Sequence, residues 1–483
     1  MSNNVAIKHY KKPVEPQFTK QDASTTTVLY GGLTFNHEYL LKGAIEGLGY
    51  HANYLPVPDN QALQTGKEYG NRGQCNPTYY TVGNLIRYLK KLKKSGVQDI
   101  EKRFVYLTAG ACGPCRFGMY ESEYRNSLRN AGFENFRVLT FEQTDSFSPK
   151  PTGGFETDRN FYIALIKALV LGDMLNEIGY RIRAYEEEKG ETDNVISTYR
   201  ERLYNALQEG SSVRIHLREL YKRLKQIKVN YLNVKPRVQI IGEFWAQTTE
   251  GDGNYRLAKW LESEGAEVKI EPIGTWIDYL LWSSALMEKE NMRIKPFKAI
   301  KRLAGIFLLK RLFKSYFNAY RRELGGWIHD LPSQDRLAQY ASPYFNVHIT
   351  GGEGHLEVGK HIMAFREKKA HMVVSVKPFG CMPSTLSDGV QSKVIEDIPD
   401  SIFVSIETSG DAEINVKSRV QMKLYEARQK AIEEFNSALS RYHVTYTDLK
   451  ELIKKDKSLS NPLIKLPHVY TGTSANFVAY LAS

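Results

Sequence analysis

The four cysteines of this chain stand in settings that point most directly to chemistry. Cys75, Cys112, Cys115 and Cys381 all lie in Gly- or Pro-rich turns, within GNRGQCNP, AGACGPCRFG and KPFGCMP. A buried structural cysteine is more usual inside an apolar strand or helix. A turn of this kind instead presents a side chain to a ligand, so we interpret the thiols as ligand-binding or reactive groups.

A single metal site is the first interpretation of the four cysteines. Thiolates select iron–sulfur clusters, zinc or copper, and glycines beside them let backbone N–H groups approach the sulfurs. Structural zinc usually binds two closely spaced cysteine pairs, whereas only Cys112 and Cys115 form a close pair here. The pattern favours an iron–sulfur cluster over zinc, with an incidental grouping of cysteines as a further alternative.

A redox-active dithiol is the second interpretation, and it concerns Cys112 and Cys115 alone. The CGPC segment follows a predicted strand and precedes a predicted helix, where a thiol pKa is lowered. Ala111 stands where thioredoxins have Trp, and this chain is several times longer than a thioredoxin. The dithiol interpretation also leaves Cys75 and Cys381 unexplained, so it ranks below the cluster.

A partial phosphate-binding pattern occurs in the carboxyl-terminal part of the chain. Gly354 is followed by Gly359 and Lys360 at the spacing of a P-loop, but His361 stands where Ser or Thr would bind magnesium. We interpret GGEGHLEVGK as a tight turn into a helix rather than as a nucleotide site.

A basic segment is the strongest local charge feature. Between Lys289 and Arg322 there are eleven Lys or Arg residues against one acidic residue, Glu290. A solvated helix face would explain this run. The functional alternatives are a surface for an acidic protein partner, for a phosphorylated ligand such as coenzyme A, or, ranked last, for nucleic acid.

Two carboxylates are candidates for acid–base catalysis. Glu243 and Glu353 each follow a glycine after a predicted strand, a position from which a carboxylate can reach a substrate. Helix capping is the simpler explanation for both. Four histidines are weaker candidates of the same kind: His216, His355, His361 and His371.

The elements that must position these residues alternate between strand and helix. In the first part of the chain, apolar runs predict strands at 26–31, 50–55, 103–109 and 136–141, with helices at 37–46, 77–94 and 119–130. This alternation predicts a parallel, doubly wound sheet. Cysteines in loops after such strands lie where open α/β sheets bind ligands.

The whole chain is predicted to be an α/β protein with several Rossmann- or flavodoxin-like parallel-sheet domains and helical insertions. We expect a polar tail at 1–25, an α/β domain at 26–150, a helical connector at 151–235, a second α/β unit at 236–286, a basic helical insert at 287–345 and a third α/β unit at 346–483.

Composition excludes several classes of protein. The chain has 483 residues, 42% of them hydrophobic, and its 66 Lys and Arg outnumber its 54 Asp and Glu. This length can bury a core without disulfides. The amino-terminal segment lacks an apolar signal region, and the most apolar stretch, 161–175, contains Lys167 and Asp173. We expect a cytoplasmic protein that neither spans a membrane nor is secreted.

The cysteine neighbourhoods resemble those of the 2-hydroxyacyl-CoA dehydratase and benzoyl-CoA reductase superfamily. The similarity is closest to the dehydratase-like portion of its large CoA-enzyme activase-associated proteins. The matching segments are GQCNPTYYTVGNLI, AGACGPCRFGMYESEYRNSLRNAG and VKPFGCMPST, extended by IIGEF, GAEV and GEGHLEVG. They cover most of the chain from about residue 26 onward.

The resemblance implies an oxygen-sensitive [4Fe–4S] cluster between α/β domains. It assigns Cys75, Cys115 and Cys381 as ligands and leaves one iron open to substrate or solvent. Cys112 departs from this three-cysteine pattern. If Cys112 also binds iron, no iron is left open to substrate, and the cluster is suited to electron transfer. Some relatives hold larger double-cubane clusters with more cysteine ligands, and the four cysteines of this chain favour a single cubane over that alternative.

The resemblance also implies partners. It predicts a separate ATPase activator with its own cluster as electron donor, a homodimer or heterodimer, and an acyl-CoA substrate. No membrane or nucleic-acid partner is expected. The leading hypothesis is thus the iron–sulfur component of an anaerobic reductase or dehydratase that reduces a resistant substrate by one electron. A non-catalytic electron-transfer subunit and a CxxC thiol–disulfide oxidoreductase are the alternatives.

Overall fold

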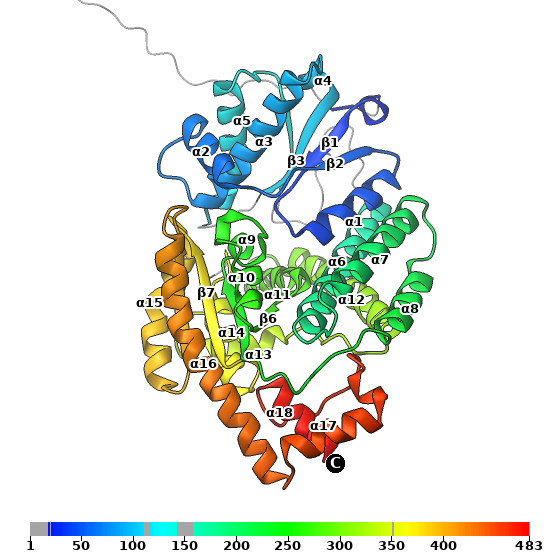
Figure 1. Ribbon diagram of the computed structural model, residues 1–483. Coiled ribbons are helices and arrows are strands. Elements are labelled where there is room, and N and C mark those ends of the chain that lie inside the picture. Colours follow the sequence, from blue (N-terminus) through cyan, green and yellow to red (C-terminus); the bar gives the residue numbers. More distant parts are fainter. Residues whose placement is uncertain (1–17, 20, 111–114, 143–157, 350–351, 483) are drawn as a thin grey trace, which may run out of the picture.

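A computed structural model describes residues 18–19, 21–110, 115–142, 158–349 and 352–482. Two four-stranded sheets, both parallel throughout their strand pairings, form the frame of the described chain. Figure 1 shows the first sheet with its helices at the top of the molecule and the second sheet below it. The expected α/β class with parallel sheets is confirmed.

The first sheet has the strand order β2-β1-β3-β4. Its strands are β1 (Thr27–Tyr30), β2 (His51–Tyr54), β3 (Phe104–Gly110) and β4 (Arg137–Glu142). Its helices are α1 (Phe35–Glu46), α2 (Asn60–Tyr69), α3 (Asn76–Lys94), α4 (Ile100–Arg103) and α5 (Tyr120–Asn130). The central strands carry short apolar runs because helices cover both faces of a parallel sheet. Helix α2 and the short helix α4 were not predicted from the sequence.

The predicted helical connector consists of three helices. They are α6 (Arg159–Arg183), α7 (Glu191–Gln208) and α8 (Val213–Leu224). Their apolar residues form one large core together with α1, α12 and the carboxyl-terminal helix α18. The connector therefore packs against elements from both ends of the chain.

The second sheet unites two segments that we expected as separate units, 236–286 and 346–483. Its order is β6-β5-β7-β8, with β5 (Arg237–Gly242), β6 (Glu267–Ile270), β7 (Met372–Pro378) and β8 (Ile402–Thr408). Val238 of β5 pairs with Met372 of β7. Residues 238–242 of β5 are all buried, so this strand needs a neighbour on each side, and β7 supplies the second one.

The remaining helices surround the second sheet or extend from it. They are α9 (Phe244–Thr248), α10 (Leu257–Ser263), α11 (Ile273–Asn291), α12 (Pro296–Glu323), α13 (Gln334–Ala341), α14 (His355–Arg366), α15 (Met382–Asp397), α16 (Glu413–Arg441), α17 (Tyr446–Lys455) and α18 (Thr473–Leu481). The basic segment forms α12. Among the described helices, none combines the length and apolar character that a membrane crossing requires.

Buried polar contacts fix the first sheet domain on the rest of the molecule. His37 Nε2 lies 3.1 Å from Asp173 Oδ1, and Asp173 also accepts the backbone N–H of Ile273 at 2.7 Å. Glu250 accepts the backbone N–H of Phe35, at 2.8 Å, from the start of α1. These bonds join α1 to α6, α11 and the loop after α9, and they hold the loops of the two sheets at fixed positions.

Candidate functional site

Each of the three described cysteines immediately precedes a helix. Cys75 is the N-cap residue of α3, Cys381 is that of α15, and Cys115 precedes the 3-10 turn η2 (Arg116–Met119) that leads into α5. The free N–H groups and the positive dipole end of a helix favour negative charge at this position. Cys112 lies outside the described residues.

The setting of Cys75 corrects one expectation. We placed its turn directly after a strand, but α2 intervenes between β2 and this turn. Asp59 caps α2 by accepting the Ala62 N–H at 2.8 Å, a local signal that the sequence analysis missed. The expected positions of Cys115 and Cys381 after β3 and β7 are confirmed.

Direct contacts join the Cys75 turn to the Cys381 turn. The Asn76 N–H donates to the Phe379 carbonyl oxygen at 3.1 Å. Gly380 has a φ of +78°, and a Cβ atom there would lie 3.4 Å from the Cys75 Cα atom. The left-handed φ of this turn is what requires glycine, and the 3.4 Å distance shows that the two chain segments are in van der Waals contact. Cys75 and Cys381 are both buried.

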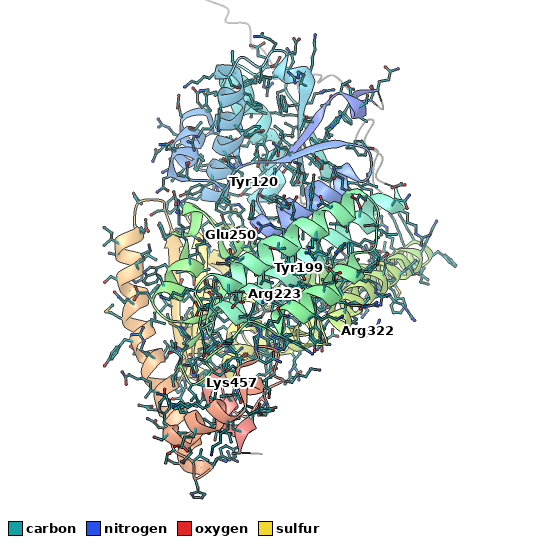
Figure 2. The ribbon with its side chains drawn as sticks, turned by 45° about the vertical axis from the view of Figure 1, so that its right-hand side comes forward. Tyr120, Tyr199, Arg223, Glu250, Arg322 and Lys457 are labelled. Atoms are coloured by element: carbon teal, nitrogen blue, oxygen red, sulfur yellow. The ribbon has the colours of Figure 1, made fainter. Side chains whose placement is uncertain are left out.

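A second set of contacts joins the Cys75 turn to the segment after Cys115. The sulfur of Cys75 lies 3.1 Å from the Tyr120 hydroxyl oxygen and 3.3 Å from the Thr78 hydroxyl oxygen. The Arg116 guanidinium donates to the Gly73 carbonyl. Figure 2 shows Tyr120 where the upper domain meets the rest of the molecule. The three cysteine segments therefore meet at the boundary between the two sheet domains.

The two candidate carboxylates lie in the same place. Glu243 follows β5 and accepts the Ala246 N–H at 2.8 Å, which makes it the N-cap of α9. Glu353 precedes α14 and accepts the Phe244 N–H, also at 2.8 Å. Both carboxylates thus bind the amino end of α9, as the helix-capping explanation predicted. A Cβ atom added at Gly352, the residue before Glu353, would lie only 2.4 Å from the Pro383 side chain. This loop therefore packs closely on the start of α15, directly after Cys381.

Burial and mutual repulsion raise the pKa values of these groups. Loss of water raises the pKa of Glu243, and loss of water together with the charge of Glu243 raises that of Glu353. Burial and the charges of both glutamates raise the pKa of Cys115 to about 12 and that of Cys381 still further. Two carboxylates and two thiols therefore act on one another electrostatically, and without a bound cation all of them favour their protonated forms.

Three free thiols, those of Cys75, Cys115 and Cys381, form the soft donor set of this site, and soft thiolates are the usual ligands of iron–sulfur clusters. Among the described residues, no three His, Cys, Asp or Glu side chains lie close enough together to hold one metal ion. A cluster of several irons bridges thiolates that a single ion would not reach, and backbone N–H groups commonly donate to its sulfurs. Cys75, Cys115 and Cys381 would hold it, each at the start of a helical segment.

The four histidines considered above do not join the thiols. His216 lies on α8, 3.7 Å from Glu219, and His371 pairs with Glu434 at 3.2 Å, at the amino end of β7. His361 bonds Gln391 at 2.7 Å, and burial lowers its pKa to about 4. His355 lies between the rings of Tyr279 and Trp282, and burial also lowers its pKa to about 4. His216 and His371 thus pair with carboxylates, whereas His355 and His361 are buried against aromatic rings.

The phosphate-loop pattern forms no exposed loop in the part that the structure describes. Gly354 is a turn residue with a φ of +42°, and α14 starts at the next residue. Gly359, Lys360 and His361 are buried within this helix. The expected turn into a helix is confirmed.

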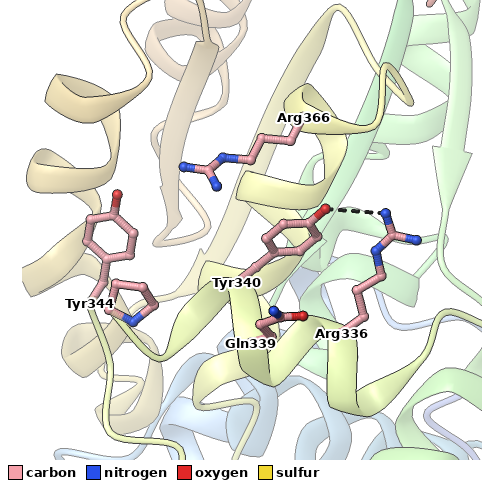
Figure 3. A pocket seen from close by; sticks show the side chains of 6 residues that line it. Arg336, Gln339, Tyr340, Tyr344 and Arg366 are labelled. Carbon is pink, nitrogen blue, oxygen red and sulfur yellow. Dashed lines mark hydrogen bonds between the residues drawn. The ribbon is translucent and has the colours of Figure 1, made fainter.

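A separate surface cavity of about 520 Å³ lies between α13 and α14 (Figure 3). The ring of Tyr340 lies near two guanidinium groups there. Its centroid is 5.8 Å from the guanidinium carbon of Arg336 and 6.0 Å from that of Arg366. Glu367 binds Arg336, and Tyr344 donates to Asp397, so much of the polar lining is already paired. None of the thiols or candidate acid–base residues lines this cavity, so we do not place the functional site here.

Tyr120 is the site residue that the sequence analysis missed. It lies five residues beyond Cys115, in a helix that we predicted, but residue type alone does not reveal its contact with Cys75.

No family model matches the chain, and no curated protein matches it either.

Proposed function

We propose that the protein is the iron–sulfur component of an anaerobic, activator-dependent reductase or 2-hydroxyacyl-CoA dehydratase-like system. Cys75, Cys115 and Cys381 would hold a [4Fe–4S] cluster between the two sheet domains, with Cys112 as a possible fourth ligand. When bound, such a cluster supplies one-electron reduction of a substrate that ordinary acid–base groups cannot reduce.

One observation carries this proposal, the convergence of three cysteines from distant segments of the chain. The Cys75 turn contacts both the Phe379–Gly380 turn and Tyr120. Unrelated structural cysteines have no reason to meet, and each of these precedes a helical segment whose N–H groups favour a thiolate. Burial and the two carboxylates nevertheless raise the pKa values of Cys115 and Cys381 and favour their neutral thiols. A bound cation would therefore be needed to stabilise the thiolates.

The glutamates would supply protons near the cluster. Because the pKa values of Glu243 and Glu353 are raised, both carboxyl groups favour the protonated form at higher pH than exposed glutamates do. Glu353 is only 6% exposed, so a proton held there is kept from bulk solvent. We assign the pair to proton delivery as a substrate accepts an electron.

The partners follow from the same resemblance. By analogy with the superfamily, a separate ATPase activator would deliver the electron. Residues 355–361 of this chain lie in helix α14 rather than in a phosphate-binding loop. An acyl-CoA thioester is the substrate class proposed by analogy with the superfamily.

Cysteine substitution tests the proposal. We expect Cys381→Ser to lose most of the bound iron after anaerobic purification, because a serine oxygen replaces a soft ligand. Met382→Leu is the matched control, since Met382 is the next residue and is about half exposed. Equal iron content in both variants and in the unaltered protein would contradict the proposal.

A further inference from the structure

Helix α12 presents large apolar side chains to solvent. The exposed fractions are 89% for Phe297, 66% for Phe307 and 68% for Leu308, and Ile300 is 56% exposed. Ala304 lies among them and is also exposed. We call these five residues the α12 strip. Figure 2 shows this helix along the right-hand side of the molecule, next to the labelled Arg322.

The α12 strip is distinct from the face that anchors the helix. Ala299, Ile306, Phe313, Phe317 and Tyr320 are buried, and they recur at the spacing of one helix face. The strip occupies the opposite face, at positions 297, 300, 304, 307 and 308. A helix that is apolar on two faces is normally covered on both.

We propose that a second copy of this chain covers the α12 strip, with the two α12 helices antiparallel and crossing at Ala304. Such an interface is two-fold symmetric, so each pair of contacts occurs twice. Ala304 and Gly305 are small, and a Cβ atom at Gly305 would meet nothing within 4 Å. This point of the helix therefore admits close approach of another backbone.

The strip is complementary to itself in this orientation. Crossing at Ala304 places Phe297 opposite the partner's Arg311, Ile300 opposite the partner's Leu308, and Lys301 opposite the partner's Phe307. Lys301 and Arg311 are exposed, and a cation over an aromatic ring is favourable. Lys301 and Arg311 thus each meet a ring of the other copy.

The size of the strip also suits a pair of protein surfaces. At ~150–250 Å² for each aromatic side chain, the exposed parts of Phe297 and Phe307 alone offer on the order of 300 Å² per copy. A stable interface buries ~800 Å² per partner, and the aliphatic residues of the strip and Ile294, which is 76% exposed, add to this area. The proposal does not rest on the proposed function.

The basic residues of α12 give the interface a characteristic salt dependence. Four cations of α12 have carboxylate partners within the chain: Asp278 lies 3.2 Å from Lys310 and 3.7 Å from Lys314, Glu288 lies 2.8 Å from Arg302, and Asp330 lies 2.8 Å from Arg321. The remaining positive charges of the two copies repel each other across the contact. Added salt screens this repulsion, so the dimer should become tighter as the salt concentration rises. An acidic protein partner or an anionic bilayer would bind α12 more weakly under the same conditions.

Sedimentation velocity of the full chain tests the proposal. We expect a dimer whose dissociation constant falls at least severalfold between about 0.05 M and about 0.5 M NaCl. Phe307→Asp should give a monomer, whereas Met422→Asp, which alters an exposed apolar residue of α16, should not. A monomeric protein overturns the proposal, and so does a dimer that Phe307→Asp leaves unchanged.

A disulfide tests the crossing point itself. Two helix axes ~8–10 Å apart, each with a Cα radius of ~2.3 Å, bring facing Cα atoms within reach of a disulfide. Ala304→Cys should therefore form a covalent dimer on oxidation. Asn318→Cys should not, because antiparallel helices separate these two positions by ~40 Å. Equal cross-linking of both variants would overturn the antiparallel arrangement. Cosedimentation of a monomeric protein with phosphatidylglycerol vesicles would assign the strip to lipid instead.

Discussion

The sulfur of Cys75 lies 3.1 Å from the hydroxyl oxygen of Tyr120, a residue 45 positions further along the chain. Burial and the proximity of Cys75 raise the pKa of Tyr120 well above its usual value, so the hydroxyl keeps its proton. A protonated hydroxyl beside a sulfur can donate a hydrogen bond to it. The contact links the amino end of α3 to that of α5 and gives the thiol site a polar neighbour that no cysteine motif reveals.

Tyr120→Phe tests this contact. Its loss should cost about 0.5–1.5 kcal/mol of stability. In iron-loaded protein it should also make the reduction potential more negative, because hydrogen bonds to sulfur ligands raise that potential. Tyr124→Phe is the control, since Tyr124 lies one turn further along α5 and bonds Tyr106 at 3.2 Å. The same potential in both variants would show that Tyr120 does not act on the cluster.

The role of Cys112 is tested against that of Cys115. If three cysteines hold the cluster and one iron is open, Cys112→Ser should retain its iron while Cys115→Ser should lose it. Iron analysis with the visible spectrum of anaerobically purified variants measures this. Loss of iron from both variants would indicate a closed, four-thiolate cluster and favour a non-catalytic electron-transfer subunit.

The pH dependence of stability tests the buried carboxyl of Glu353. Its pKa in the folded protein is raised above the ordinary 4.5 by burial and by Glu243. The folded state therefore holds a proton that the unfolded chain releases. The associated stability is complete below the unfolded pKa and is lost as the pH rises through the folded pKa.

Glu353→Gln should remove this loss while keeping an oxygen that accepts the Phe244 N–H. We expect the melting temperature of the unaltered protein to fall more steeply from mildly acidic to alkaline pH than that of the variant, by ~1 °C for each kcal/mol of stability lost. Glu209→Gln, at an exposed position of the chain, is the control. Parallel pH profiles for Glu353→Gln and the unaltered protein would contradict the raised pKa.

Gly380→Ala tests the left-handed turn between β7 and Cys381. The φ of +78° disfavours any residue with a Cβ atom, so the substitution should destabilise the protein by about 1–2 kcal/mol. Gly389→Ala lies within α15, where a Cβ atom meets nothing within 4 Å. That variant should instead gain about 0.5–1 kcal/mol. Denaturant unfolding compares the two, and a Gly380→Ala variant as stable as the unaltered protein would contradict the strain argument.

The sequence predicted the local elements better than their assembly. Apolar runs located β1, β3, β5 and β7, and Gly- and Pro-rich turns located the cysteines at the starts of helical segments. The sharing of one sheet by β5 and β7 was not predictable, because 134 residues separate the paired Val238 and Met372 and no local pattern specifies which strands pair. Tyr120 was missed for the same reason, since its contact with Cys75 depends on how two distant turns meet.

The pairing of Glu243 and Glu353 is a second feature that could not be predicted from the sequence. Their positions after glycines suggested catalysis or capping, and the structure shows that Glu243 caps α9 and that Glu353 binds the same helix end. Burial raises the pKa values of both carboxyl groups, and it depends on how distant segments pack around them. Sequence spacing carries no information about such a pair.

Iron and acid-labile sulfide per chain, measured on anaerobically purified protein together with its visible spectrum, test the central claim most directly. The account predicts about four of each, with broad absorption near ~400 nm that dithionite bleaches. A colourless protein that lacks both elements after anaerobic reconstitution would contradict a cluster at Cys75, Cys115 and Cys381. The Cys112–Cys115 dithiol would then become the leading explanation.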